Sequence, residues 1–484
     1  MDSFETVSGI KKPRLNSGRT AQAKEYSRFF LPMRKLLPSR LYCRLRNRTV
    51  SCPAARWLVF SYTQPVGIYA PPRSFLKLVY AIILCFFLQY DLNAGKVFLC
   101  QSCTYRLIRL IRTLFYRSFC ATVFCMQKSI MLFTIVSFLV SVCLIPLIIK
   151  FCKFYSLYDT VNSRKIHSGE IPRLGGVGIV LSFIICATVC FYSDKSLSFF
   201  NAAPLLAAGS LIFLFGILDD IVEMRAILKL IVQLIATAIV VLNGYCFRQI
   251  FGLMLPEPVG ILLTFFWLLG MINAYNLIDG LDGLCGTLAL TALVSLGIML
   301  YGSFNEGTAI CFILSASILG FLVFNWPAPN AKIFMGDGGS QFLGFMIATI
   351  PLYSSNDNFE YNKFLIMLVI VSFPMLDTIA AIWRRIRDHR PVMSPDRLHL
   401  HHKLLNLGFS KRNALIMVLL IQILICTTVV LSSYMEKEKG IILLAVAYLF
   451  MIGFYCVIHY TNRAVLQKIR LENEARNSGI TPKL

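Results

Sequence analysis

The chain has 484 residues, of which 57% are hydrophobic and only 15% are charged, and its mean hydropathy is +0.68. This composition excludes a soluble globular protein and predicts many apolar helices in a membrane. The net charge of +23 could suggest a nucleic-acid partner, but basic loops beside membrane spans produce the same excess, so we expect no nucleic-acid binding.

Residues 1–125 differ from the rest of the chain because they hold 20 Lys and Arg against four Asp and Glu. An Arg-rich, acid-poor segment is typical of a targeting peptide. However, Met126, a nearby Lys and a long apolar run resemble the usual start of a membrane protein. We therefore expect a basic extension over 1–125 that is spurious, disordered or dispensable, a transmembrane domain over 126–462 and a cytoplasmic tail over 463–484.

The apolar segments after Met126 predict an all-α, polytopic integral membrane protein with about eleven spans of roughly 20 residues each. They lie near 130–150, 175–192, 202–218, 226–243, 259–274, 284–301, 308–324, 339–354, 362–383, 413–433 and 440–460.

Alternate loops between these spans differ in charge. One set carries most of the Lys and Arg residues, whereas the other carries only Lys195, Arg248, Lys437 and Lys439. Because basic loops stay in the cytoplasm, we place the first set there and the start of the first span outside.

The first basic loop, DTVNSRKIHSGEIPRLGGVGI, contains Arg164, Lys165 and His167. These residues could bind a phosphate group, or they could simply reflect the charge bias of cytoplasmic loops.

Two acids, Asp219 and Asp220, end the third expected span in FGILDDIVEMRAILKLIVQ. A carboxylate pair at a membrane face suits a divalent metal or proton acceptance. The pair could equally cap the following helix, since acids favour helix N-termini.

The string NAYNLIDGLDGLCG places Asn276, Asp279 and Asp282 between two long apolar runs. Acids at bilayer depth are costly and usually functional. Their oxygens suit Mg²⁺, although a tight turn between two helices would also use Asp, Asn and Gly.

Asp337 lies among glycines in IFMGDGGSQFLGF, at the mouth of the eighth expected span. Such a loop lets backbone amides approach a phosphate or a metal.

Three of the six histidines, His399, His401 and His402, cluster in PDRLHLHHKLL near several arginines. Their spacing differs from that of helical zinc pairs, so a phosphate-binding surface is the better interpretation, with a solvated basic loop as the alternative.

Every polar cluster thus falls in a loop of the cytoplasmic set. Acids suited to Mg²⁺ and ringed by basic residues are the groups that phosphoryl transfer requires. A Walker A string is absent, which argues against an ATP-driven pump.

Together these strings resemble the polyprenyl-phosphate N-acetylhexosamine-1-phosphate transferases, the superfamily that includes the phospho-MurNAc-pentapeptide transferases. The resemblance covers about 126–460 and rests on five motifs in family order, including LDD at 218–220 with KLxxQ at 229–233. It implies that a polyprenyl phosphate attacks a UDP-sugar, that UMP leaves, and that Mg²⁺ or Mn²⁺ is the cofactor.

The resemblance also implies residue roles. It assigns the metal to Asn276 and Asp337. It assigns substrate binding to the basic residues Arg164, Lys165, His167 and Lys229. It assigns the chemistry to Asp219, Asp220, Asp279, Asp282, Arg397, His399, His401 and His402.

Within the superfamily, RLGGVGI and PDRLHLHH look more like the branch that transfers GlcNAc 1-phosphate to undecaprenyl phosphate and starts O-antigen, lipopolysaccharide or similar cell-wall glycans. We expect this activity in a bacterial inner membrane, with the site facing the cytoplasm and a homodimer as one possible state. The pentapeptide-transferase branch is the alternative, and a secondary transporter is a distant one.

Overall fold

The computed structural model describes residues 127–158, 171–222, 224–327, 330–353, 357–391 and 398–477, together with two short strands near residue 90. The chain divides into two compact units, Met1–Cys103 and Thr104–Leu484. In the first unit, β1 (Tyr90–Asp91) pairs antiparallel with β2 (Lys96–Val97). Otherwise the expected extension over 1–125 lies outside the described residues.

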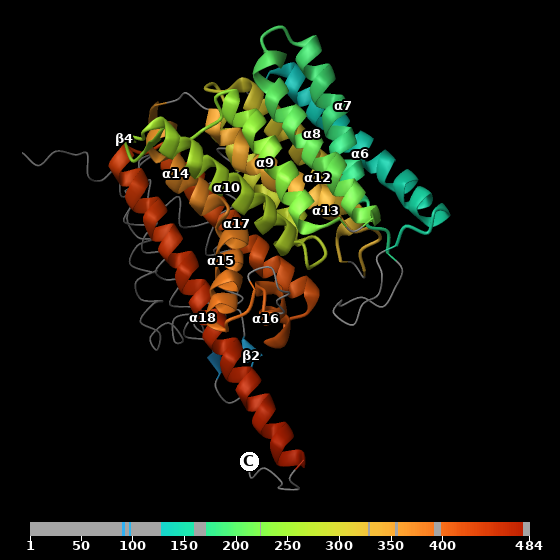
Figure 1. Cartoon of the computed structure of the whole chain (residues 1–484), viewed down its shortest axis with the longest axis vertical. Coiled ribbons are helices and arrows are strands. Elements are labelled where there is room, and N and C mark those ends of the chain that lie inside the picture. The colour runs from blue at the N-terminus through green and yellow to red at the C-terminus, as the bar shows by residue number, and fades with distance from the viewer. Residues whose placement is uncertain are drawn as a thin grey trace, which may run out of the picture. The chain divides into compact units, whose positions relative to one another are not determined.

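The second unit is a bundle of helices, labelled here as in Figure 1. Its helices are α6 (Lys128–Phe154), α7 (Gly175–Ser193), α8 (Phe199–Val222), α9 (Ala226–Leu242), α10 (Glu257–Ile278), α11 (Leu284–Leu300), α12 (Asn305–Asn325), α13 (Asp337–Thr349), η2 (Ile350–Tyr353), α14 (Asp357–Ile370), α15 (Ser372–Arg387), α16 (Leu400–Asn406), α17 (Lys411–Ser433) and α18 (Lys437–Asn477). One hairpin, β3 (Gln249–Ile250) with β4 (Leu253–Met254), interrupts the helices between α9 and α10.

Helices occur at all eleven positions expected for spans, but the count of eleven spans is not confirmed. Among the described residues, seven helices are long and apolar enough to cross a membrane: α6, α7, α8, α10, α12, α17 and α18. The pair α14 and α15, bent by 72°, would make an eighth. The other three helices are shorter than a typical span of roughly 20 residues, since α9 and α11 have 17 residues and α13 has 13.

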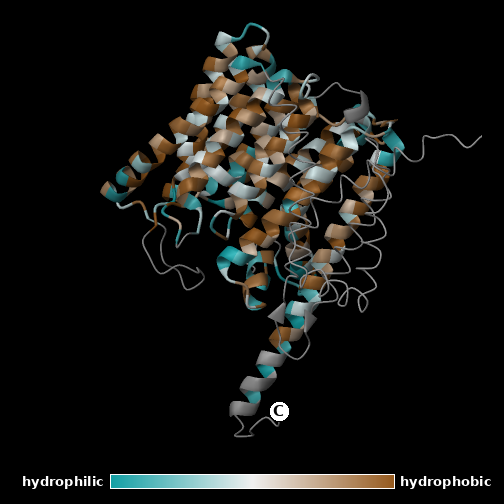
Figure 2. Cartoon of the chain, turned by 180° about the vertical axis from the view of Figure 1, so that it is seen from behind, coloured by the Kyte–Doolittle hydropathy of each residue, from teal (hydrophilic) through white to brown (hydrophobic). Residues whose placement is uncertain are grey.

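Apolar residues cover the length of the bundle, and hydrophilic residues gather in the loops at the helix ends (Figure 2). Exposed leucine, isoleucine and phenylalanine side chains are frequent on α6 and α9, as expected for helices that face lipid.

The expected boundary at residue 462 falls inside α18, which continues without a break to Asn477.

Helix α13 is the centre of the bundle, with contacts to α7, α8, α10 and α11. Twelve of its 13 residues are buried, from Gly338 to Thr349. Its first turn meets α8 with no side chain between, since a Cβ on Gly216 would lie 2.3 Å from the Cα of Gly338. This close packing fixes the N-terminus of α13, and therefore Asp337, against the end of α8.

Candidate active site

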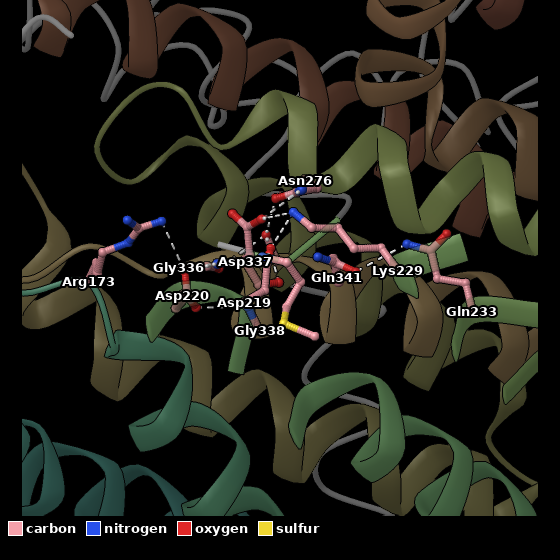
Figure 3. Close-up of polar contacts among 12 residues, drawn as sticks. Arg173, Asp219, Asp220, Lys229, Gln233, Asn276, Gly336, Asp337, Gly338 and Gln341 are labelled. Carbon is pink, nitrogen blue, oxygen red and sulfur yellow. Dashed lines mark hydrogen bonds and ion pairs between the residues drawn. The ribbon is translucent and has the colours of Figure 1, made fainter. Parts of the chain in front are cut away.

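Asp220 holds the first turn of α13 in place (Figure 3). Its Oδ1 accepts the backbone N–H of Asp337 at 2.9 Å, and its Oδ2 accepts that of Gly338 at 3.1 Å. These N–H groups have no partner inside their own helix, so a carboxylate stabilises them as a cap from another helix. Asp220 therefore caps a helix, as one sequence interpretation had it, but the helix is α13 rather than α9.

A backbone pairing joins the end of the first basic loop to the approach of α13. Phe334 N–H donates to the Pro172 carbonyl at 2.7 Å, and Gly176 N–H donates to that of Met335 at 2.7 Å. Arg173 belongs to the same stretch, and its Nη2 lies 3.4 Å from Asp220 Oδ1. Figure 3 shows this ion pair. The strings RLGG and IFMGDGG therefore form one structural unit around Asp220.

Gly336 makes the turn into α13 possible. Its φ of +81° is a conformation that residues with a Cβ rarely adopt. A Cβ there would also lie 2.2 Å from the Arg173 carbonyl oxygen and 2.6 Å from Asp220 Oδ2. Only glycine fits at this position.

Lys229, at the start of α9, lies between two of the carboxylates (Figure 3). Its ammonium forms an ion pair with Asp219 and lies 3.4 Å from Asp337 Oδ2. Asp219 also accepts the backbone N–H of Met224 at 2.8 Å. In this arrangement the positive charge of Lys229 neutralises the two carboxylates, Asp219 and Asp337.

Asn276, near the end of α10, completes the centre. Its Nδ2 donates to Asp337 Oδ2 at 3.4 Å, and its Oδ1 accepts from Ser340 Oγ at 2.9 Å. The Asp337 side chain is 29% exposed, against 4% for Asp219. Asp337 is thus more accessible to a ligand than Asp219 is.

One helical turn further into the bundle, three amide side chains link the same helices. Asn273 Nδ2 donates to Gln233 Oε1 at 2.9 Å, and Gln233 Nε2 donates to Gln341 Oε1 at 3.2 Å. Asn273 lies three positions before Asn276, and Gln233 and Gln341 lie four positions after Lys229 and Asp337. Each amide is therefore one helical turn from a residue of the acidic centre and packs beneath it.

Asp279 and Asp282 follow α10 in the loop before α11. Burial first, and then the negative charges of Asp337, Asp220 and Asp282, raise the pKa of Asp279 well above its usual range. Asp282 is buried, with 5% of its surface exposed. The loop therefore lies close enough to Asp220 and Asp337 for their charges to act on Asp279, and the catalytic roles of Asp279 and Asp282 stay predictions.

The histidine string lies against this loop. His401 is almost fully buried, and a Cβ on Gly280 would lie 2.4 Å from its Cε1. Burial, together with the neighbouring His402, lowers the pKa of His401 to about 3, so its ring is neutral at physiological pH. Next to it, the rings of His399 and His401 stack at 6.0 Å between centroids.

The structure adds one acid that the sequence interpretation missed. Asp377, in α15, lies 2.8 Å through its Oδ2 from His399 Nδ1 and is 1% exposed. The sequence contained a signal for this residue, because Asp377 stands inside the apolar string SFPMLDTIAAIW. An acid in such a string is as unusual as Asp279 between its two apolar runs.

Four predicted site residues lie outside the described residues. Arg164, Lys165 and His167 fall in 159–170, and Arg397 falls in 392–397. Their roles stay predictions.

The residues expected to hold Mg²⁺ fit that ion in donor chemistry. Asp337 offers a reachable carboxylate, and the carbonyl oxygen of Asn276 retains a second lone pair beside its bond to Ser340. Mg²⁺ prefers one or two such protein oxygens together with water and substrate phosphates. The carboxylates that raise the pKa of Asp279 also favour a cation nearby.

Comparison with known proteins supplies the family. The profile of glycosyl transferase family 4 matches residues 202–355, which include α8 to α13. An undecaprenyl-phosphate alpha-N-acetylglucosaminyl 1-phosphate transferase of Escherichia coli O157:H7 is 30% identical over 345 residues, which are 69% of this chain and 93% of that protein. The chain belongs to glycosyl transferase family 4.

Two further relatives of this family 4 transferase agree in name. A Yersinia pestis protein with the same name is 32% identical over 62% of this chain and 84% of its own length. A Bacillus subtilis protein, named as a probable undecaprenyl-phosphate N-acetylglucosaminyl 1-phosphate transferase, is 31% identical over 59% of this chain and 80% of its own length. The family 4 transferase described here is therefore an enzyme and a multi-pass membrane protein, as its sequence predicts.

The contact between His401 and Gly280 gives a first prediction. Gly280→Ala should displace the His401 ring and lower transferase turnover by about tenfold or more, because small displacements in an active site are costly. Turnover with a UDP-sugar and a polyprenyl phosphate measures the effect. Gly270→Ala is the matched control, since a Cβ there meets nothing within 4 Å. Equal turnover of the two variants would contradict a required contact.

Proposed function

We propose that the enzyme transfers a sugar 1-phosphate, most simply GlcNAc 1-phosphate, from a UDP-sugar to undecaprenyl phosphate and releases UMP. The supporting observation is that α8, α9, α10 and α13 bring Asp219, Lys229, Asn276 and Asp337 together at one end of the bundle. Loops at a bundle end lie at the headgroup level, where a lipid phosphate and a soluble nucleotide sugar can meet.

In the proposed reaction an oxygen of the lipid phosphate attacks the β-phosphorus of the UDP-sugar. A new oxygen–phosphorus bond forms, and the bond from the β-phosphorus to the bridging oxygen breaks. UMP leaves with that oxygen, and a polyprenyl-diphosphate sugar is the other product. No oxidant or second nucleotide is needed.

The residues position the reacting groups and neutralise their charge. Lys229, between Asp219 and Asp337, supplies positive charge where the two phosphate groups would meet. Asp219 is the nearest carboxylate to orient that ammonium. Asp220 acts indirectly, because its hydrogen bonds hold the N-terminus of α13 in place.

A divalent cation, Mg²⁺ or Mn²⁺, would be held by Asp337 and Asn276. When bound, it would supply charge neutralisation at the diphosphate. The amide of Asn276 is kept in place for this by Ser340, and the carboxylate of Asp337 by the capped first turn of α13.

The choice of GlcNAc rests on the strings RLGGVGI and PDRLHLHH and on the names of the relatives. Transfer of phospho-MurNAc-pentapeptide is the alternative substrate choice for the same chemistry. Membership of a transferase family argues against the transporter alternative. The bacterial relatives support a place in a bacterial inner membrane, with the acidic centre facing the cytoplasm, as the first membrane step of envelope polysaccharide synthesis.

The test is isotope exchange. Membranes containing the enzyme, undecaprenyl phosphate and Mg²⁺ should move labelled UMP into UDP-GlcNAc, and EDTA should stop the exchange until Mg²⁺ is restored. Exchange only into UDP-MurNAc-pentapeptide would support the alternative branch. The absence of exchange into every UDP-sugar tried would refute the proposal.

A further inference from the structure

A buried acid on α15 makes two hydrogen bonds to the start of α16. Asp377 Oδ2 lies 2.8 Å from His399 Nδ1, and Asp377 Oδ1 accepts the Leu400 backbone N–H at 2.8 Å. Both oxygens therefore contact consecutive residues of the histidine string. No part of the transfer reaction described above uses this carboxylate.

The bond to the ring decides which nitrogen of His399 carries a proton. An ionised carboxylate has no proton to donate, so in the bond between Asp377 Oδ2 and His399 the ring Nδ1 is the donor. In the neutral ring, Nε2 is then the nitrogen with a free lone pair. Without Asp377 the ring would be free to adopt the opposite tautomer and to rotate.

The second bond fixes where the ring stands. His399 is the residue before α16, and Leu400 is the first residue of that helix. By accepting the Leu400 N–H, Asp377 ties the start of α16 to α15 and leaves the His399 side chain little freedom. Helix α15 in turn packs against α10, which ends at the acid loop.

A chain of ring contacts continues from His399 to the acidic centre. Its ring is nearly parallel to that of His401, at 6°, and His401 lies against Gly280 beside Asp279. When the orientation of the His399 ring is fixed, the packing of the His401 ring beside it is fixed as well.

We propose that Asp377 is a positioning residue of the transferase: it holds His399 as the Nδ1–H tautomer, with Nε2 presented for the reaction. The role rests on the proposed function and deepens it. It follows the general arrangement in which a buried carboxylate orients a functional histidine.

The first test is a double-mutant cycle. Asp377→Asn keeps the shape of the side chain but cannot accept both N–H groups with the same strength. We expect turnover to fall about 10- to 100-fold, with the KM for the UDP-sugar changed less than kcat. If Asp377 acts through His399, the double variant Asp377→Asn with His399→Gln should stay within about twofold of His399→Gln alone. Losses that multiply would overturn the proposal.

The matched control is Asp388→Asn. Asp388 follows the same helix, but it is 39% exposed and pairs with Arg387. Its variant should retain turnover. A loss as large as that of Asp377→Asn would also count against a specific role, because it would show a general sensitivity of this region to charge.

A second measurement does not depend on catalysis. In the ¹⁵N spectrum of the wild-type protein labelled at histidine, with His399→Gln used for assignment, we expect the His399 signals of a protonated Nδ1. A bare Nδ1 with a protonated Nε2 would overturn the proposal. Since this readout contains no substrate, it separates a wrong tautomer from a wrong substrate assignment.

Discussion

Asp337→Asn should lower the rate of UMP exchange by about 100- to 1,000-fold, while the protein still inserts and remains folded. Asp337 is more exposed than Asp219 and is contacted by both Lys229 and Asn276. The amide keeps the size of the side chain and its place at the start of α13. It removes the negative charge that Lys229 and a divalent cation would share.

The measurement is exchange at saturating Mg²⁺, with thermal stability in detergent as the check on folding. Because the Asp337 backbone N–H still donates to Asp220, the capped turn should survive the substitution. Turnover near the wild-type level would show that Asp337 has no role at the metal or at the phosphates.

Gly336→Ala should abolish activity by a different route, through the backbone. With φ +81° and ψ 166°, Gly336 has a backbone conformation that is essentially restricted to glycine and costs other residues about 1–3 kcal/mol. The new Cβ would also have to displace the Arg173 carbonyl, 2.2 Å away, and the Asp220 carboxylate. Since the Asp220 carboxylate and the adjoining Pro172 carbonyl hold the approach to α13, we expect both a lower melting temperature and no detectable exchange.

Gly302→Ala separates the two causes. Gly302 has a φ of +80°, almost the same as Gly336, but a Cβ there meets nothing within 4 Å. This variant should show the strain of a positive φ without a close contact, and it should keep its turnover. If the two variants behaved alike, the close contact of Gly336 with Arg173 and Asp220 would not be what the site depends on.

The positions of most helices could be predicted from the sequence, because long apolar segments directly indicate membrane helices. The number of membrane spans could not be predicted, because a helix buried inside the bundle, such as α13, is also largely apolar. Its burial comes from packing against α7, α8, α10 and α11, and this packing has no local signature.

The candidate residues could be named from their chemistry, since acids and histidines near apolar runs are rare enough to stand out. Their pairing could not be predicted. Asp220 bonds to residues 117 and 118 positions later in the chain, and Lys229 reaches Asp337 across 108 positions. Asp377 was overlooked because it stands alone in an apolar helix, whereas the other acids stand in recognisable strings.

The central position of α13 has a consequence for the order of events during synthesis. The ribosome completes α8, α9 and α10 before α13. Asp219, Lys229 and Asn276 are therefore made before Asp337, the carboxylate that they surround. During that interval Asp220 has no helix N-terminus to cap. We therefore expect no transferase activity until α13 has moved between α8 and α10, and until α16, which is made later still, has brought the histidines to the acid loop.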